Sequence, residues 1–343
     1  MRRITPFALA ALLCAFTTVS HAAPAYAPPP TAADKSWKLP PVPMPQDNVS
    51  TPSRIELGQA LFFDPRMSGN GAMSCASCHN PSLGWSDGLK TAVGWGGQVL
   101  GRATPTVVNT AFNTQFMWDG RKKSLEDQAL GPMKTPQEMN TDFAAALARL
   151  RGVPGYVAMF DKAYPGEGIR EETIAKAIAA FERTVVVNDS AFDRWLAGDR
   201  KAMTMEQWRG YKVFVDEAKG NCVACHSAPN FTDNGFHNIG VAKGDGDADP
   251  GRYAIRKVAS MKGAFKTPSL RDIEMTAPYF RDGSATTLHD VVEHYVTGGV
   301  DHTNLSGSMK PLTLSAREKD ELVAFMKALT GERKPLNVPH LPQ

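Results

Sequence analysis

The sequence predicts an all-α fold made of two similar domains with extensive loops. Three observations support this expectation. Apolar residues recur mainly at helical spacing, and little of the chain alternates as strands do. A plan of helix, CxxCH motif, long irregular loop and further helix occurs twice, from about residue 50 and again from about residue 200. The chain has 343 residues and 42% apolar content, which is enough for two medium-sized domains with cores of their own.

Residues 1–22 predict a secretory signal peptide. Arg2 and Arg3 form a basic start, a mostly apolar stretch runs from Phe7 to Val19, and Ser20 and Ala22 provide a small-residue cleavage site near Ala22. The apolar stretch is too short to form a membrane-spanning helix. We therefore expect an exported protein that is cleaved near Ala22, resides in the periplasm and does not associate with the membrane.

Removal of this segment changes two counts. Cys14 leaves, so four of the five cysteines remain, all within the two CxxCH motifs. The net charge falls from +3 to +1, because Arg2 and Arg3 leave and no acidic residue does. A nearly neutral protein has no general attraction to nucleic acid or anionic lipid, so neither is expected as a partner.

The remaining chain divides into a leader and two domains. Residues 23–50 are rich in Pro and Ala with little to bury, which predicts a flexible leader. An amphipathic helix through Ile55, Leu57 and Leu61 is expected to open the first domain, residues 51–197. The second domain is expected to span residues 198–335.

Two later segments also have the pattern of amphipathic helices. Within residues 171–187, the apolar residues Ile174, Ile178, Phe181 and Val185 share one face. The segment from 315 to 331 opens with a capping box formed by Ser315 and Glu318. The core face of this second helix is expected to consist of Leu322, Phe325, Met326 and Leu329.

The two CxxCH motifs match the attachment pattern of c-type haem, in which both cysteines bind the porphyrin and the adjacent histidine ligates iron. The alternatives are a disulfide, a redox-active CxxC pair or half of a zinc site. Zinc sites rarely place His directly after the second Cys, and a redox pair would not use every remaining cysteine in two such motifs. We expect two covalent c-type haems in two cytochrome c-like domains, attached through the motif residues Cys75, Cys78, His79, Cys222, Cys225 and His226.

The distal ligands decide whether two haems only carry electrons or form an active site. Residues 287–297 predict a helix whose inward face holds Tyr295 together with Leu288, Val291 and Val292. The neighbouring His294 lies about 100° away, on the polar flank. Periodicity alone leaves two interpretations of Tyr295: a core residue with a satisfied hydroxyl, or an iron ligand.

The chain resembles the bacterial dihaem cytochrome c peroxidases and their MauG-like relatives over about residues 50–335. The resemblance rests on the following segments, in order: CASCHNP, LGRATPTVVNTAFN, FMWDGR, SLEDQALGP, PQEMN, AKAIAAFERT, CVACHS, GRY, KTPSLRDI, APYFRDG and VVEHY. In that family the first haem reacts with peroxide and the second transfers electrons. The resemblance implies that His79 ligates the peroxidatic haem and His226 the second haem. It also implies that Tyr295, at a position held by Met in the peroxidases and by Tyr in MauG-like members, is the distal ligand of the second haem.

The segment TAVGWGGQ departs from the pattern of many of these peroxidases. Trp95 stands where they have a histidine that caps the first haem until reduction releases it. Tryptophan cannot ligate iron, and no histidine lies between His79 and His226. The first haem is therefore expected to be open at rest.

Further site residues follow from the same resemblance. Trp118 matches the tryptophan between the haems, whereas Gln128 and Glu138 match the glutamine and glutamate of the distal pocket. Pro132 and Met139 are expected to line that pocket. Cleavage of peroxide needs a group that moves a proton from one oxygen to the other; Glu138 suits this role, and Gln128 would orient peroxide or water. Without the resemblance, such residues are more often found on the surface.

The family usually holds a calcium ion between its domains, bound by an asparagine side chain and backbone carbonyls. The carbonyls of Thr276 and Pro278 stand at matching positions. Ala103, however, stands where the family has the asparagine. This difference leaves calcium binding open.

The expected function is the reduction of hydrogen peroxide to water, with electrons from a small periplasmic cytochrome c or cupredoxin. An anionic tyrosine ligand stabilises high oxidation states of iron, so the two oxidising equivalents would be shared as two Fe(IV) centres. The alternative is a MauG-like enzyme, which uses the same equivalents to oxidise residues of a partner protein and so matures its cofactor. A plain electron-transfer cytochrome is disfavoured by Gln128, Glu138 and the missing distal ligand at the first haem.

Overall fold

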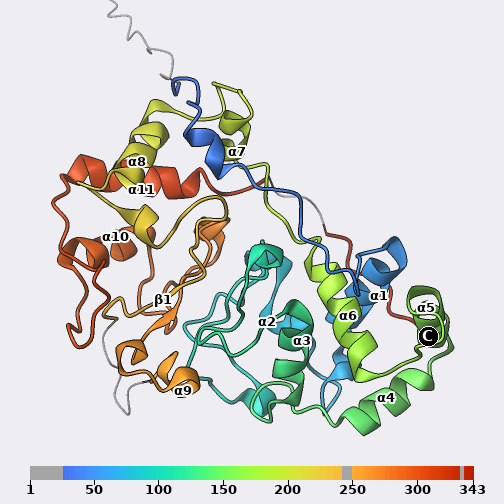
Figure 1. The fold of residues 1–343 in the computed structure, drawn as a ribbon. Helices are drawn as coiled ribbons and strands as arrows, with labels where there is room; N and C mark the ends of the chain where they lie inside the picture. Colours follow the sequence, from blue (N-terminus) through green and yellow to red (C-terminus); the bar gives the residue numbers. More distant parts are fainter. Residues whose placement is uncertain (1–25, 242–248, 333–335) are drawn as a thin grey trace, which may run out of the picture.

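The computed structural model describes residues 26–241, 249–332 and 336–343. The predicted signal peptide, residues 1–22, lies outside the described residues. The described chain is mainly helical, as predicted (Figure 1). Its α-helices are α1 Pro52–Phe63, α2 Cys75–Cys78, α3 Leu125–Lys134, α4 Phe143–Arg151, α5 Pro154–Ala163, α6 Glu171–Glu182, α7 Ala191–Leu196, α8 Met205–Val215, α9 Tyr253–Arg256, α10 Leu288–Thr297 and α11 Ala316–Lys327. Among these residues, strands are limited to β1 Phe236–His237 and β2 Phe265–Lys266, which pair antiparallel.

Two separate hydrophobic clusters form the main cores. The first is built from α1, α3, α5 and α6 and includes Leu57, Leu61, Phe160, Ile174 and Ile178. The second is built from α7, α8, α10 and α11, and its members include Phe192, Phe214, Val292, Leu322 and Phe325. Figure 1 shows these two groups of helices in different parts of the molecule, joined by long loops. The all-α fold class is thus confirmed.

Each core depends on a glycine where two helices cross closely. A Cβ atom at Gly58 of α1 would overlap the carbonyl of Ala177 in α6. A Cβ atom at Gly210 of α8 would overlap the carbonyl of Glu321 in α11. In both halves the helix that precedes the CxxCH motif therefore packs backbone to backbone against a later helix, which repeats one plan.

The predicted start of α11 and the predicted bounds of α10 are confirmed, whereas α11 ends at Lys327 and not at the expected residue 331. The side chain of Ser315 accepts a hydrogen bond from the backbone N–H of Glu318, and the carboxylate of Glu318 accepts one in return from the N–H of Ser315. Thr287 and Asp290 form the same reciprocal pair at the start of α10. Gly298 ends α10 in the left-handed conformation, with φ of 78°, which glycine adopts without strain.

The expectation of a flexible leader requires correction for residues 26–50. Ala27 and Trp37 are buried in the second cluster. Asn48 is fully buried against the first half, where its amide donates to the carboxylate of Glu126 and to the carbonyl of Lys176. The composition suggested little to bury, but the few apolar and amide side chains of this segment are placed at contacts with distant helices.

Some segments pack against the half of the molecule to which they do not belong by sequence. Helix α7 packs in the second cluster, so the change of core occurs upstream of the predicted boundary near residue 198. At the other end, the N–H of Gly155 in the first half donates to the carbonyl of Gln343. None of the described helices is long and apolar enough to cross a membrane.

Candidate functional site

The four cysteines of the two motifs are free thiols in partly buried positions. Burial raises the pKa of Cys75 and of Cys222 to about 12, and that of Cys78 and of Cys225 to about 11. Burial therefore disfavours the thiolate form of all four side chains. Two pairs of unpaired thiols, each followed by a histidine, fit the attachment of two haems.

Both motif histidines have one ring nitrogen held by a backbone carbonyl. His79 Nδ1 lies 3.2 Å from the carbonyl oxygen of Trp85, and His226 Nδ1 lies 3.0 Å from that of Phe231. Burial lowers the pKa of both imidazoles and so favours their neutral form. With Nδ1 as the donor, Nε2 keeps its lone pair, as a metal-ligating histidine requires.

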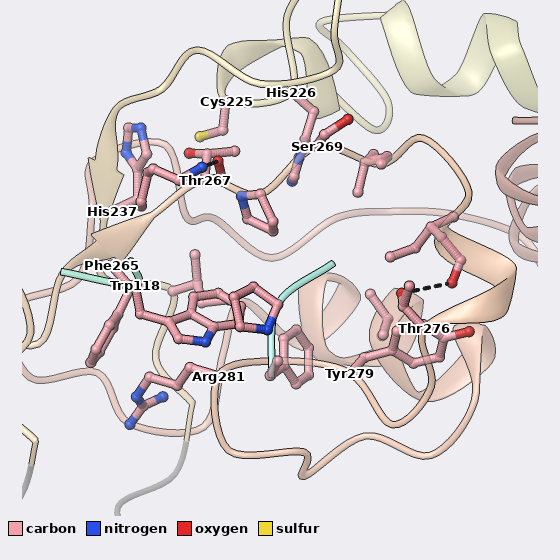
Figure 2. Close-up of a pocket in the computed structure, with 18 of the residues that line it drawn as sticks. Trp118, Cys225, His226, His237, Phe265, Thr267, Ser269, Thr276, Tyr279 and Arg281 are labelled. Atoms are coloured by element: carbon pink, nitrogen blue, oxygen red, sulfur yellow. Dashed lines mark hydrogen bonds between the residues drawn. The ribbon is translucent and has the colours of Figure 1, made fainter. Parts of the chain in front are cut away.

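One continuous cavity is lined by both motif histidines. Its wall also contains Trp118, Gln128 and Tyr295. Figure 2 shows Cys225 and His226 on one side of this space and Trp118, Tyr279 and Arg281 on the opposite side. The described residues thus bring both predicted haem sites to a shared interior space.

A buried cation in this wall was not predicted. Lys266 of β2 lines the cavity, is only 9% exposed, and donates from Nζ to the carbonyl of Thr267 at 2.8 Å. Burial lowers the pKa of Lys266 to about 8. A lysine with this surrounding suits an anionic group in the cavity, and haem carries two propionate carboxylates. Lys266 opens the segment KTPSLRDI, which carries part of the family resemblance and was the signal that could have found it.

The side chains of Tyr295 and His294 lie in different surroundings, and the ligand role of Tyr295 stays a prediction. Tyr295 lines the cavity together with Leu288, Val291 and Val292. His294 is not among the lining residues; its Nε2 lies 2.8 Å from the carbonyl oxygen of Ile239. Burial raises the pKa of Tyr295 above its ordinary value, so a phenolate at this position requires a cation such as iron beside it.

The residues expected around the first haem fall into two groups. Gln128 and Trp118 line the cavity, and Gln128 Nε2 lies 3.9 Å from Met117 Sδ. Trp95, Pro132, Glu138 and Met139 are not part of that wall. The N–H of Trp95 donates to the carbonyl of Gln137, so Trp95 lies next to Glu138.

Glu138 and its surroundings are partly buried. Desolvation raises the pKa of Glu138, against the opposing charges of Arg121 and Arg102. Its charge in turn contributes to the raised pKa of Cys78, which places the carboxylate near the first motif. Met139, by contrast, is 5% exposed and belongs to the first hydrophobic core, where its N–H donates to the carbonyl of Pro132.

Trp118 contacts both halves of the chain through hydrogen bonds. Its indole Nε1 donates to the carbonyl of Ala103 at 2.8 Å, and its own carbonyl accepts from the N–H of Lys266 at 2.8 Å. Figure 2 shows Trp118 beside Phe265 and Arg281. The indole therefore has a fixed position in the cavity wall.

A second titratable residue of the cavity was also missed. Glu182, at the end of α6, lines the cavity, and burial raises its pKa to about 8. Among the described residues its Oε2 has no hydrogen-bond partner. Its position four residues after Ile178 on the apolar stripe was a signal in the sequence that could have found it.

The structure supports the expected calcium site only in part. Thr276 and Pro278 line the cavity. The described residues contain no group of three or more His, Cys, Asp or Glu side chains that could hold a metal ion. Ala103 is buried, and its carbonyl accepts the Trp118 indole. A calcium ion held by backbone carbonyls stays a prediction.

Comparison with known proteins identifies the family. Residues 52–201 match the family model described as "Di-haem cytochrome c peroxidase". The chain is 47% identical over 302 residues to the methylamine utilization protein MauG of Methylorubrum extorquens, covering 88% of this chain and 85% of the relative. It is 38% identical to the cytochrome c551 peroxidase of Nitrosomonas europaea, covering 84% and 83% of the two chains.

A solved structure agrees with these relatives. The crystal structure of a MauG-like protein associated with microbial copper homeostasis superposes with a TM-score of 0.80 at 33% identity, covering 86% of this chain and 95% of that chain. The fold, the paired motifs on one cavity and these relatives lead to one conclusion. The chain belongs to the family of dihaem cytochrome c peroxidases and MauG proteins and is a haem-containing oxidoreductase.

Proposed function

We propose that this protein is a periplasmic peroxidase that reduces hydrogen peroxide to water. Two protons and two electrons convert one peroxide into two waters, and the electrons come from a small cytochrome c or cupredoxin. The observation that carries the proposal is that Gln128 and Trp118 line the same cavity as both motif histidines. Gln128, which would orient peroxide, and Trp118, which would carry electrons between the haems, thus lie where two haems are expected.

Haem, when bound, supplies iron that accepts peroxide and stores the resulting oxidising equivalents across the two sites. In this proposal Cys75, Cys78, Cys222 and Cys225 attach the two groups covalently, and His79 and His226 hold the irons through Nε2. Their neutral, carbonyl-held imidazoles support this role.

In this proposal Glu138, which lies near the first motif but outside the described cavity wall, moves the proton between the peroxide oxygens, and Gln128 orients the peroxide through its side-chain amide. A general base works best when its pKa lies near the working pH. The pKa of Glu138 is raised by burial, in the direction that this role needs. Trp95 takes the place of a switching histidine, so the first iron needs no prior reduction.

In this proposal Tyr295 would hold the second iron as a phenolate. An anionic oxygen ligand stabilises the higher oxidation states of iron, which allows one oxidising equivalent to be kept at the second site. The face of α10 that carries Tyr295 into the cavity wall supports this assignment.

A second candidate function is the MauG-like one, in which residues of a partner protein are oxidised to mature its cofactor. The 47% identity to the methylamine utilization protein MauG favours it specifically. Both functions use the same haems and the same peroxide.

Two experiments separate the candidates. The purified holoprotein should oxidise a reduced small cytochrome c or cupredoxin in proportion to added peroxide. If it consumes peroxide without oxidising any such donor, and a deletion strain accumulates a partner protein without its mature cofactor, the MauG-like function replaces the peroxidase.

A further inference from the structure

Both motif histidines are held by aromatic residues with an unusual backbone. The carbonyls that face His79 Nδ1 and His226 Nδ1 belong to Trp85, with φ of 59°, and Phe231, with φ of 55°. Bulky residues rarely adopt positive φ, so the surrounding structure must hold them there. What holds each aromatic ring therefore also holds the histidine.

In the first half, the support comes from the helices of the same core. The ring of Trp85 lies 5.8 Å from that of Phe62 in α1 and 5.9 Å from that of Phe181 in α6, between ring centroids. The first histidine is thus fixed by residues of its own domain.

In the second half, part of the support comes from the N-terminal segment. Trp37, at the end of the 3₁₀-helix Asp34–Trp37, stacks on Phe231 with ring centroids 4.5 Å apart and an interplanar angle of 29°. Phe231 is completely buried, and Trp37 is 5% exposed. The edges of Phe192 and Phe214 pack on the same ring, at 5.6 and 5.9 Å.

We define the N-terminal strap as residues 26–38. It is anchored along its length to the second half. The N–H of Ala27 donates to the carbonyl of Met203 at 3.0 Å, Trp195 Nε1 donates to the carbonyl of Pro28 at 2.7 Å, and the hydroxyl of Tyr211 donates to Asp34 at 2.6 Å. These contacts keep Trp37 in place over Phe231.

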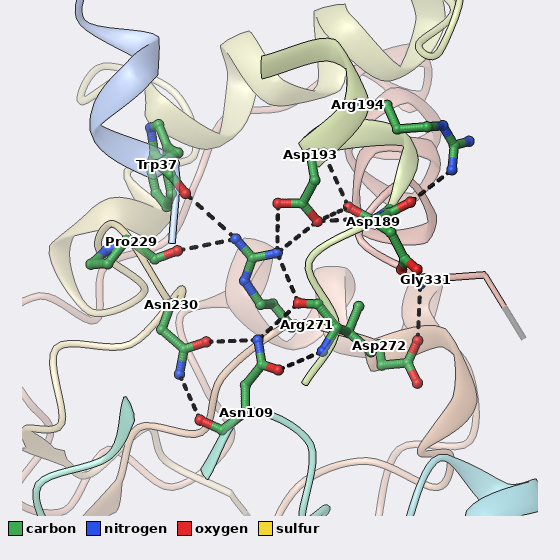
Figure 3. Close-up of polar contacts among 12 residues, drawn as sticks. Trp37, Asn109, Asp189, Asp193, Arg194, Pro229, Asn230, Arg271, Asp272 and Gly331 are labelled. Carbon is green, nitrogen blue, oxygen red and sulfur yellow. Dashed lines mark hydrogen bonds and ion pairs between the residues drawn. The ribbon is translucent and has the colours of Figure 1, made fainter. Parts of the chain in front are cut away.

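Arg271 links the strap to the loop that carries Phe231. Its guanidinium is completely buried, pairs with Asp193 at 2.9 Å, and donates to the carbonyls of Trp37 and Pro229 at 3.5 and 3.3 Å. It also lies 5.5 Å from the centroid of the Phe231 ring. Figure 3 shows Arg271 between Trp37, Pro229 and Asp193. The strap and the loop after the second motif are therefore fixed by one shared cation.

We propose that Trp37 is a positioning residue for the second haem, acting through Phe231 on His226. This inference rests on the proposed role of His226 as an iron ligand. A carbonyl that accepts Nδ1–H orients the imidazole and makes Nε2 a stronger donor, which favours ferric over ferrous iron. The strap thereby influences the midpoint potential of the second haem and does not affect that of the first.

The test compares three variants of the holoprotein by EPR of the ferric state and by redox titration. In Trp37→Ala the low-spin signal of the second haem should shift or broaden and its midpoint potential should rise, because the Phe231 carbonyl is no longer held. Trp37→Phe keeps an aromatic ring and should restore most of the wild-type signal. Val323→Ala is the control, because Val323 is buried in the same core but neither lines the cavity nor makes any of the strap contacts described above, and this variant should leave the second haem unchanged.

The outcomes separate the inference from the function on which it rests. Unchanged second-haem signals in folded Trp37→Ala, or equal changes at both haems, would overturn the positioning role, as would an equal shift in Val323→Ala. If Trp37→Ala does not fold, Trp37→Leu keeps an apolar side chain without the ring stack, and the same shift is expected. Retention of the second-haem low-spin signal in His226→Ala would instead show that the ligand assignment itself is wrong.

Discussion

Single residues on α10 show how one step along a helix changes the available chemistry. Tyr295 lies in the cavity wall, whereas the ring of His294, 4.7 Å from that of Phe280, is engaged by the carbonyl of Ile239. Helical phase predicted this difference, because successive side chains are separated by about 100°. The carbonyl that binds His294 comes from a loop distant in the sequence and could not be predicted.

Exchange of these two neighbours tests the ligand of the second haem. We expect Tyr295→His to keep a six-coordinate second haem, since imidazole also ligates iron, but to lose stabilisation of its high oxidation state. His294→Ala should leave that haem nearly unchanged. The EPR signal of the low-spin haem decides: a shift in His294→Ala without one in Tyr295→His means that the wrong neighbour was chosen.

The variant Glu138→Gln tests the role of Glu138, because glutamine has nearly the same size but cannot accept and release a proton as a carboxylate does. Both haems should be retained while the rate of reaction with peroxide falls by ~10²–10⁴-fold, the usual contribution of general acid–base catalysis. The wild-type rate should also fall as the pH drops through the pKa of Glu138, because only the carboxylate accepts a proton. Burial raises that pKa, so the fall begins at a higher pH than for an exposed glutamate.

Stopped-flow rates across a pH series measure both effects. The pH dependence should disappear in Glu138→Gln. An unimpaired rate in this variant would remove Glu138 from the mechanism.

At the scale of elements, helices with caps were predictable and contacts between distant segments were not. The reciprocal capping pairs at Thr287 and Ser315 are local, and so are the apolar faces that follow them. The strap was missed because Tyr26 and Trp37 are isolated aromatic residues in a Pro-rich segment without helical or strand periodicity. The surface that buries it is assembled from α7, α8 and the loop after the second motif.

The loop that carries Trp95 has a direct kinetic consequence. Since this loop offers no histidine to cap the first iron, we expect the fully ferric enzyme to react with peroxide without prior reduction. Mixing ferric protein with peroxide in a stopped-flow spectrometer should give a fast change in the Soret band. A protein that stays inert until one haem is reduced would contradict this expectation.

The close helix crossings at Gly58 and Gly210 allow a prediction of the stability lost when a side chain is added there. Gly210→Ala forces a methyl group into the carbonyl of Glu321, and overpacking of this kind costs about 1–3 kcal/mol. Chemical denaturation followed by tryptophan fluorescence should show that loss. Gly101→Ala is the control, because no atom lies within 4 Å of the added Cβ. Equal stability of the two variants would mean that the close crossing adds nothing.

At the scale of the whole molecule, the two halves meet around Trp118. Arg102 joins Asp119 to Asp249, and Arg252 donates to the carbonyls of Asp119 and Gly120. Asn109 and Asn230 also exchange hydrogen bonds between the two halves, as Figure 3 shows. These polar contacts hold the segment around Trp118 rigidly between the motifs. The paired haem motifs were readable in the sequence, whereas this interface depends on residues far apart along the chain.

Trp118 should therefore control communication between the two haems more than chemistry at either one. Its indole donates to Ala103 in the first half, and its carbonyl accepts from Lys266 in the second half. Trp118→Phe keeps the backbone bond and an aromatic ring but removes the indole donor and the more easily oxidised ring. We expect the first haem to react with peroxide at the wild-type rate, while the spectral change at the second haem becomes slower or is lost. Rapid-freeze EPR after mixing with peroxide follows both haems in one experiment. Simultaneous changes at wild-type rates in this variant would mean that oxidising equivalents pass between the haems by a path that does not need the indole.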